Sequence, residues 1–168
     1  MLTTQAQTGV RAPMPGVVYP DPVALAQYVR EGALGAETLV DGLRQACARH
    51  PDHVALLGPD LRMTYAELDA SSSRLAAALL RQGLRPLDRA IFQLGDSEQL
   101  ILAFFACLKA GLIPVCTLAA HREREIGYLA QLAEATLHVV QGDDPKFDGV
   151  AFARAMQAQA PTLRLILQ

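Results

Sequence analysis

Two histidines three residues apart, His50 and His53, form the pattern nearest to a metal site in this sequence. On a helix that spacing would place both imidazoles on one face, but Pro51 between them favours a turn. No cysteine or carboxylate cluster with ligand spacing accompanies the pair. Because zinc sites use three or four protein ligands, we expect no metal site here.

A second pattern is the acidic pair Asp143 and Asp144. Paired carboxylates can act as general acid and base, but Gly142 and Pro145 on either side are typical of a solvated turn, which we favour. His138 lies among strand-forming residues. We interpret it as a hydrogen-bonded histidine of the core, because buried polar groups are normally satisfied.

His121 is the substrate-side candidate of this sequence. It follows a predicted strand, 112–118, and begins a predicted helix, 121–133. Ligands of α/β proteins bind outside the carboxyl ends of parallel strands, where this residue would lie. The favoured alternative is that His121 caps the helix and helps to fix the loop.

Known signatures of phosphate and acyl chemistry are absent. The sequence contains neither GxxxxGK[ST] nor GxGxxG, and no GxSxG nucleophile elbow. Cys47, Cys107 and Cys116 form no CxxC pair and are interpreted as reduced core thiols of a cytoplasmic protein. The residues alone therefore predict no catalytic, cofactor-binding or metal-binding side chain.

Composition narrows the class of protein further. The 168 residues carry a formal net charge of -2, which disfavours nucleic acid as a partner. The longest apolar run, Leu100–Leu108, is too short to span a membrane, and the N-terminus does not resemble a signal peptide. Hydrophobic residues make up 51% of the chain, enough for a sizeable core.

The chain is organised around Phe92–His121. This segment predicts a strand end, a turn, a helix, a glycine stop and a second strand. Ser97 is the expected helix cap, and Lys109 and Gly111 mark the helix end. A strand–helix–strand unit of this kind requires parallel strands. Pro114 is a difficulty, because proline inside a strand removes a ladder hydrogen bond. Either the strand starts after Pro114 or its nitrogen faces a gap in the ladder.

The other segments continue this alternation of strands and helices. The remaining predicted elements are helices 21–30, 38–49, 64–82 and 148–157 and strands 54–57, 61–63, 89–94, 137–141 and 163–167. This pattern predicts an α/β fold, a mostly parallel sheet with helices on both faces. Residues 1–20, rich in glycine and proline, are expected to form an N-terminal arm, and residues 21–168 an α/β subdomain.

Three segments resemble the N-terminal part of adenylate-forming enzymes. Residues 50–56 (HPDHVAL) are similar to the entry into that superfamily's first strand, 63–68 (MTYAEL) to its (L/M)TYxEL helix opening, and 108–115 (LKAGLIPV) to its LKAGxxxVP-like segment. The resemblance implies the N-terminal subdomain of such an enzyme. It covers nearly the whole chain from about residue 18.

A narrower resemblance is to the aryl-acid AMP ligases of siderophore pathways. Residues 93–96 (QLGD), 104–115 (FFACLKAGLIPV) and 121–125 (HRERE) are similar to their QLGN, FFALLKLGVAPV and SHR segments. Asp96 stands where asparagine is usual, and Ala120 where serine is usual. These two departures weaken the link to the subgroup more than the link to the superfamily.

The resemblance implies a function for a longer parent enzyme. Such enzymes use ATP and Mg²⁺ to convert a carboxylic acid into an acyl-adenylate, then pass the acyl group to CoA or to a carrier-protein thiol. Their phosphate loop, acid pocket and mobile C-terminal domain are expected beyond Gln168. The chain alone is therefore expected to be an inactive scaffold whose partner is the remainder of the ligase.

Two alternatives remain open from the sequence. The chain could be a free-standing, non-catalytic binding or regulatory module derived from the same fold, or an unrelated α/β protein that shares the pattern by chance. If the chain is the scaffold of a ligase or a module derived from one, its sheet lacks the neighbouring elements of the parent enzyme. An apolar face or edge is then exposed, which could support a homodimer.

Overall fold

The computed structural model describes residues 18, 20–35, 37–58, 61–142 and 144–168, and the chain divides into two compact units, 1–38 and 39–168. Within the first unit, helix α1 (Pro22–Arg30) starts where the sequence predicts. Asp21 Oδ1 accepts hydrogen bonds from the backbone N–H groups of Val23 and Ala24, and Pro22 takes the first helical position. No residue of α1 is buried.

The second unit begins with helix α2 (Leu39–Arg49) and a hairpin of β1 (Val54–Leu57) and β2 (Arg62–Thr64), which pair antiparallel. Helix α3 (Tyr65–Arg81) follows without a loop. Its capping box is complete, because Thr64 Oγ1 accepts from the Glu67 N–H and the Glu67 carboxylate accepts from the Thr64 N–H.

A four-stranded parallel sheet forms the centre of the second unit. Its strands are β3 (Arg89–Gln93), β4 (Ile113–Cys116), β5 (Leu137–Val140) and β6 (Leu165–Leu167), in the order β4-β3-β5-β6. Helices α4 (Glu98–Lys109), α5 (Glu123–Leu132) and α6 (Gly149–Gln159) connect them. The predicted strand–helix–strand unit is therefore confirmed, with β3 and β4 parallel neighbours.

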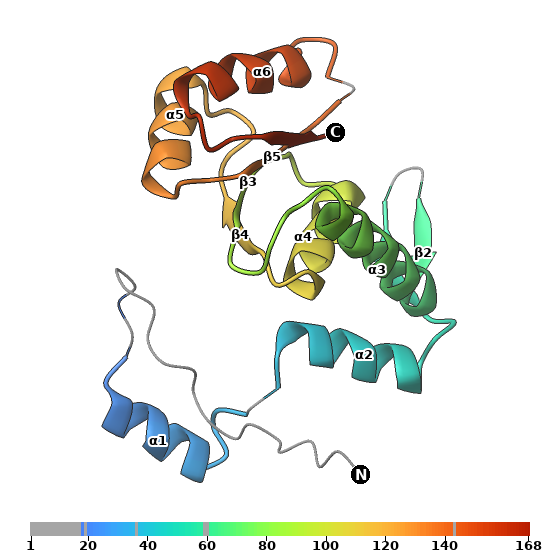
Figure 1. The fold of residues 1–168 in the computed structure, drawn as a ribbon. Helices are drawn as coiled ribbons and strands as arrows, with labels where there is room; N and C mark the ends of the chain where they lie inside the picture. Colours follow the sequence, from blue (N-terminus) through green and yellow to red (C-terminus); the bar gives the residue numbers. More distant parts are fainter. Residues whose placement is uncertain (1–17, 19, 36, 59–60, 143) are drawn as a thin grey trace. The chain divides into compact units, whose positions relative to one another are not determined.

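Alternate strand residues face two separate apolar layers, so the sheet is covered on both sides as predicted (Figure 1). Ala90 and Phe92 pack with α3 and α4, together with Leu137 and Val139. Ile91 packs on the opposite face against α5 and α6. The sequence expectation of an α/β fold with helices on both faces is confirmed.

Pro114 lies within β4, which is an edge strand of the described sheet. The backbone N–H groups of Ile113 and Thr117 donate to Asp88 and Phe92 on the β3 side. Because alternate residues point their N–H groups in opposite directions, the Pro114 nitrogen faces away from β3. The proline therefore removes no bond of the β3–β4 ladder, which decides between the two expectations for this strand.

Several boundaries differ from the sequence expectation. The strand expected over 112–118 covers only Ile113–Cys116, and α5 begins at Glu123 and not at His121. Cys107 is a buried free thiol as predicted, but Cys116 is exposed and so does not belong to the core. Among the described residues, no helix is both long and apolar enough to cross a membrane.

Candidate functional site

His121 lies in the loop that follows β4, at the carboxyl edge of the sheet. Its backbone N–H donates to the Leu118 carbonyl at 3.0 Å, and its Nδ1 accepts from the Leu118 N–H at 3.4 Å. The cap position of α5 is Arg122, whose N–H donates to Glu125. The expectation that His121 caps the helix is therefore wrong, whereas the expectation that it helps to fix the loop is confirmed by the bond from the Leu118 N–H.

This contact defines the chemistry that His121 has available. Since Nδ1 accepts a hydrogen bond from a backbone N–H, the neutral ring carries its proton on Nε2. The side chain is half-buried, so that Nε2–H group is a candidate donor to an acceptor at the sheet edge. The hydrogen bond from the Arg122 N–H is the main cause that lowers the pKa of the neighbouring Glu125 carboxyl.

Gln93, the last residue of β3, connects this loop to the sheet. Its Nε2 donates to the His121 carbonyl at 2.8 Å, and its Oε1 lies 3.0 Å from His138 Nε2 on β5. Both Gln93 and His138 are buried, at 4% and 0% exposure. Burial lowers the pKa of His138 to about 4, so this imidazole is neutral at pH 7.

The interpretation of His138 as a satisfied core histidine is only half right. Its Nε2 is paired with Gln93, but its Nδ1 is buried without a hydrogen-bond partner. The ring also meets Phe152 of α6 edge-on, with 6.2 Å between ring centroids. Sequence reasoning did not find Gln93, because a glutamine at a strand end carries no motif.

A cavity also lies at the carboxyl edge of the sheet, on the face covered by α3 and α4. It has a volume of about 500 Å³ and a mainly apolar wall built by α3, α4 and the ends of β3, β5 and β6. Its lining includes Leu94, Leu102, Val139, Leu167 and, as polar groups, Ser97, Gln99, Gln141 and Gln168. The structure therefore does not bring His121 into this cavity.

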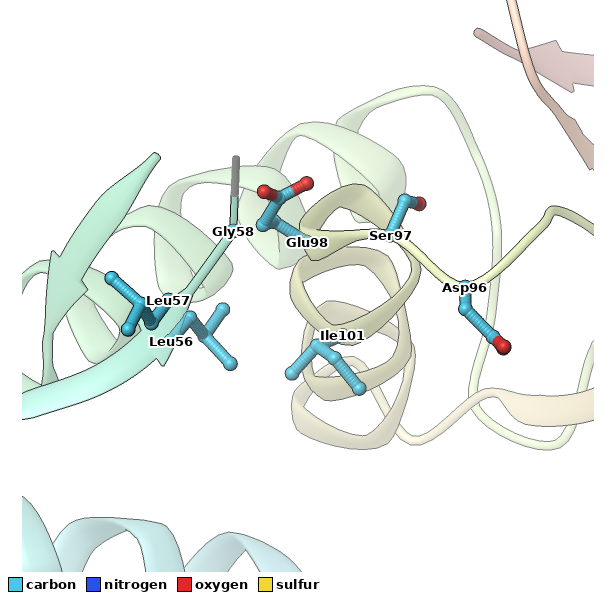
Figure 2. A pocket seen from close by; sticks show the side chains of 7 residues that line it. All are labelled: Leu56, Leu57, Gly58, Asp96, Ser97, Glu98 and Ile101. Carbon is cyan, nitrogen blue, oxygen red and sulfur yellow. The ribbon is translucent and has the colours of Figure 1, made fainter. Parts of the chain in front are cut away.

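A smaller pocket of about 290 Å³ lies between the end of β1 and the start of α4 (Figure 2). Ser97 caps α4, as predicted, with its hydroxyl accepting from the Leu100 N–H. The Glu98 carboxylate occupies the space where a side chain at Gly58 would begin. The pocket is thus partly filled by the protein's own acidic group, and the side chains that line it include two carboxylates, Asp96 and Glu98, and no cation.

The other candidates from the sequence remain separate from this edge. The rings of His50 and His53 stack 4.9 Å apart, and nowhere among the described residues do three or more His, Cys, Asp or Glu side chains gather as metal ligands would. Asp144 is exposed and accepts from the Lys146 N–H, as in a turn, while Asp143 lies outside the described residues. Burial raises the pKa of Cys107 to about 12, which makes its thiol a poor nucleophile.

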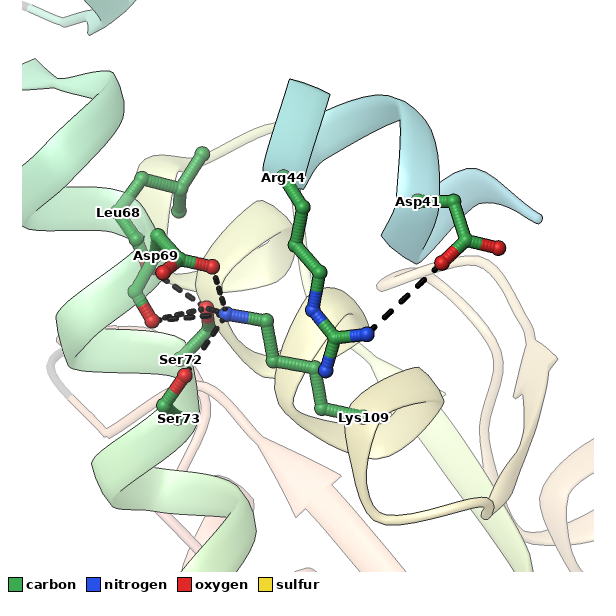
Figure 3. Close-up of polar contacts among 7 residues, drawn as sticks. All are labelled: Asp41, Arg44, Leu68, Asp69, Ser72, Ser73 and Lys109. Carbon is green, nitrogen blue, oxygen red and sulfur yellow. Dashed lines mark hydrogen bonds and ion pairs between the residues drawn. The ribbon is translucent and has the colours of Figure 1, made fainter. Parts of the chain in front are cut away.

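Lys109 is a polar centre that sequence reasoning interpreted only as a helix-end residue. Its ammonium group has three N–H donors and four acceptors around it: the carboxylate and the carbonyl of Asp69, both at 2.7 Å, and the hydroxyls of Ser72 and Ser73 at 2.7 and 3.0 Å (Figure 3). The Lys109 side chain is 5% exposed. This cluster joins α3 to α4, and of its two serines Ser72 is buried whereas Ser73 is exposed.

Comparison with known proteins identifies the relationship. Residues 43–168 match the family of AMP-binding enzymes. The chain belongs to this family. The match includes every strand of the parallel sheet and the loop that carries His121.

Aryl-acid AMP ligases are among the relatives. The chain is 33% identical over 149 residues to the 2,3-dihydroxybenzoate-AMP ligase of Bacillus subtilis, covering 89% of this chain and 28% of that enzyme. It is 39% identical over 147 residues to the salicyl-AMP ligase / salicyl-S-ArCP synthetase of Mycobacterium tuberculosis, covering 84% and 26%. The predicted resemblance to aryl-acid AMP ligases is confirmed.

A solved structure shows the same arrangement of elements. The apo structure of MbtA from Mycobacterium smegmatis superposes with a TM-score of 0.79 at 34% identity, over 88% of this chain and 27% of that one. The chain thus spans about a quarter of the length of these relatives and corresponds to their N-terminal region.

Proposed function

We propose that this chain is the N-terminal scaffold of an ATP-dependent aryl-acid adenylating ligase. The parent enzyme would join a carboxylate to ATP, releasing pyrophosphate and forming an acyl-adenylate, and then transfer the acyl group to a thiol. The observation that carries the proposal is the family match over residues 43–168, together with the aryl-acid ligases among the relatives. The domain assignment that goes with it is an arm, 1–20, and an α/β subdomain, 21–168.

The described residues suit a scaffold better than a complete active site. At the carboxyl edge of the sheet, Gln93 donates to the loop that carries His121 and is itself paired with His138. We therefore assign ATP and Mg²⁺ to the parent enzyme and derive no catalytic step from this chain's own side chains. Adenylate formation depends on positioning the carboxylate and offsetting phosphate charge, and a rigid parallel sheet supports such positioning.

The proposal extends to partners and location. The remainder of the ligase is the first partner, and CoA or an aryl carrier protein is the proposed acceptor, in a siderophore-type pathway of the cytoplasm. A homodimer is a further proposal, supported by the apolar edge strand β6, which is three residues long and only half-buried.

An ATP–pyrophosphate exchange assay tests the proposed function. The purified chain is incubated with ATP, Mg²⁺ and either salicylate or 2,3-dihydroxybenzoate. We expect no acid-dependent exchange, since the groups that would bind phosphate are not found among the described residues. Acid-dependent exchange by the chain alone would contradict the scaffold assignment.

The reading frame after the Gln168 codon gives an independent test. The proposal expects it to continue into a Ser/Thr/Gly-rich loop that ends in lysine. A stop codon at that point in the natural gene would favour a free-standing module over a scaffold.

A further inference from the structure

We propose that Gln93 is a positioning residue that holds the loop 118–122, and with it His121, at the carboxyl edge of the sheet. The inference rests on the proposed function in one respect: the edge is where the parent ligase would meet its ligand. The positioning itself is a property of this chain and can be measured without any ligand.

The hydrogen bonds of Gln93 can be arranged in one way only. The His121 carbonyl can only accept, so the amide nitrogen of Gln93 must face the loop and its oxygen must face His138. His138 must then donate from Nε2, and the lone pair of its Nδ1 is left without a hydrogen-bond donor. A single loop carbonyl therefore fixes both the amide orientation and the imidazole tautomer.

This buried pair is not explained by stability alone. If two apolar side chains replaced Gln93 and His138, no unpaired nitrogen would remain in the core. Their neighbours Phe92 and Val139 are buried apolar side chains of this kind. What an apolar pair would not supply is the donor to the His121 carbonyl. The polar pair thus makes a connection from β5 through β3 to the loop after β4.

A second group holds the same carbonyl from the outside. Arg122 Nη1 donates to the His121 carbonyl at 2.8 Å and to the Ala119 carbonyl at 2.9 Å. The Arg122 guanidinium also lies 4.0 Å from the ring centre of Phe147, which packs against Phe152. Since Arg122 is exposed, Gln93 is the buried, and therefore the more rigid, of the two donors.

The substitution Gln93→Glu separates the two halves of the connection. Glutamate still accepts from His138 Nε2 but has no hydrogen to donate to the loop. We expect amide exchange at the His121 N–H, followed by NMR, to accelerate about fivefold or more, the factor that loss of one hydrogen bond gives. Exchange at the Thr117 N–H, bonded to the Phe92 carbonyl, should stay unchanged and serves as the internal reference.

A matched control and a second readout accompany this variant. Gln99→Glu makes the same chemical change at an exposed position of α4 and should leave the loop as it is. In Gln93→Glu, the pKa of His138 should rise well above about 4, because a carboxylate then faces the imidazole. Equal acceleration at His121 and Thr117, or none at His121, would overturn the proposal.

The double variant Gln93→Leu/His138→Leu covers the case in which Gln93→Glu fails to fold. An apolar pair should preserve the core, so the urea midpoint is expected to equal or exceed that of the unaltered chain. The His121 N–H should still exchange about fivefold faster, because the buried donor to the loop is lost and only the exposed Arg122 remains. If the double variant restored slow exchange at His121, Gln93 would be a packing residue and not a positioning one.

Failure of this inference and failure of the proposed function are distinguishable. The exchange measurements use the chain by itself and do not depend on adenylation. A chain whose loop responds as expected, but whose parent forms no aryl-adenylate, would refute the function and leave the positioning role intact.

Discussion

Replacing Lys109 by methionine is expected to lower the free energy of unfolding by about 2–3 kcal/mol. Methionine preserves most of the apolar stem and removes the charge together with its hydrogen bonds. The loss falls on the contact between α3 and α4, because the ammonium group binds Asp69, Ser72 and Ser73 across it.

The magnitude follows from the exposure of the partners. Removing one member of a buried ion pair costs about 3–5 kcal/mol, since the other charge stays buried. The Asp69 side chain is 33% exposed, so water replaces part of what it loses. The Ser72 hydroxyl keeps its 2.6 Å bond to the Leu68 carbonyl. Both facts lower the expected loss to about 2–3 kcal/mol.

Urea unfolding followed by circular dichroism measures this loss. Lys146→Met is the matched control, because Lys146 is the other lysine of the sequence and is exposed. The control should change stability by less than about 0.5 kcal/mol. If Lys109→Met differed from Lys146→Met by no more than that, the interpretation of Lys109 as the polar centre of the α3–α4 contact would be refuted.

Three further expectations concern pH, capping and glycine. Burial holds the folded-state pKa of His138 near 4, below its ordinary value. The unfolding free energy should therefore fall by about 3 kcal/mol as pH drops from about 6.5 to 4. In urea titrations, His138→Leu should reduce this dependence of the unfolding free energy on pH. Thr64→Ala should lower the unfolding free energy by about 1 kcal/mol, and a thermal melt that does not change would contradict the capping role. Gly42→Ala should stabilise α2 by about 0.5–1 kcal/mol, since nothing lies near the added methyl group. Gly149→Ala should instead destabilise by about 1–3 kcal/mol, because the methyl group would lie 2.6 Å from the Gln141 carbonyl oxygen; the two alanine variants showing the same sign would contradict this account.

Local sequence signals were sufficient to predict most of the fold. Asp21, Thr64 and Ser97 cap helices that begin where the sequence predicts, because side-chain caps depend on neighbours within a few residues. Hydrophobic periodicity then identified the sheet strands, whose alternate residues face two layers of helices.

The candidate site was harder to predict, because its contacts are distant in sequence. Gln93 reaches His121 and His138, 28 and 45 residues further along the chain. Lys109 likewise meets Asp69 across 40 residues. Side-chain contacts between residues so far apart in sequence follow from how the strands and helices pack, so no local sequence pattern predicts them. His121 was located correctly at the sheet edge, but its cap role was wrong.

Pro114 shows where a local rule needs the topology. The rule that proline disfavours a strand interior holds only for a nitrogen that faces a neighbouring strand. Strand order places β4 at the edge of the described sheet, and the register points this nitrogen outward. A sequence pattern alone gives neither the edge nor the register.

Functional complementation tests the central claim most directly. Residues 1–168 are joined to the part of the Bacillus subtilis 2,3-dihydroxybenzoate-AMP ligase that lies beyond the region they match, and the hybrid is assayed for 2,3-dihydroxybenzoate-dependent ATP–pyrophosphate exchange. A hybrid lacking residues 1–168 is the control. The account predicts exchange by the complete hybrid and none by the control or by the chain alone. A complete hybrid that is folded, as judged by circular dichroism, yet inactive would contradict the claim that this chain is an adenylating-ligase scaffold.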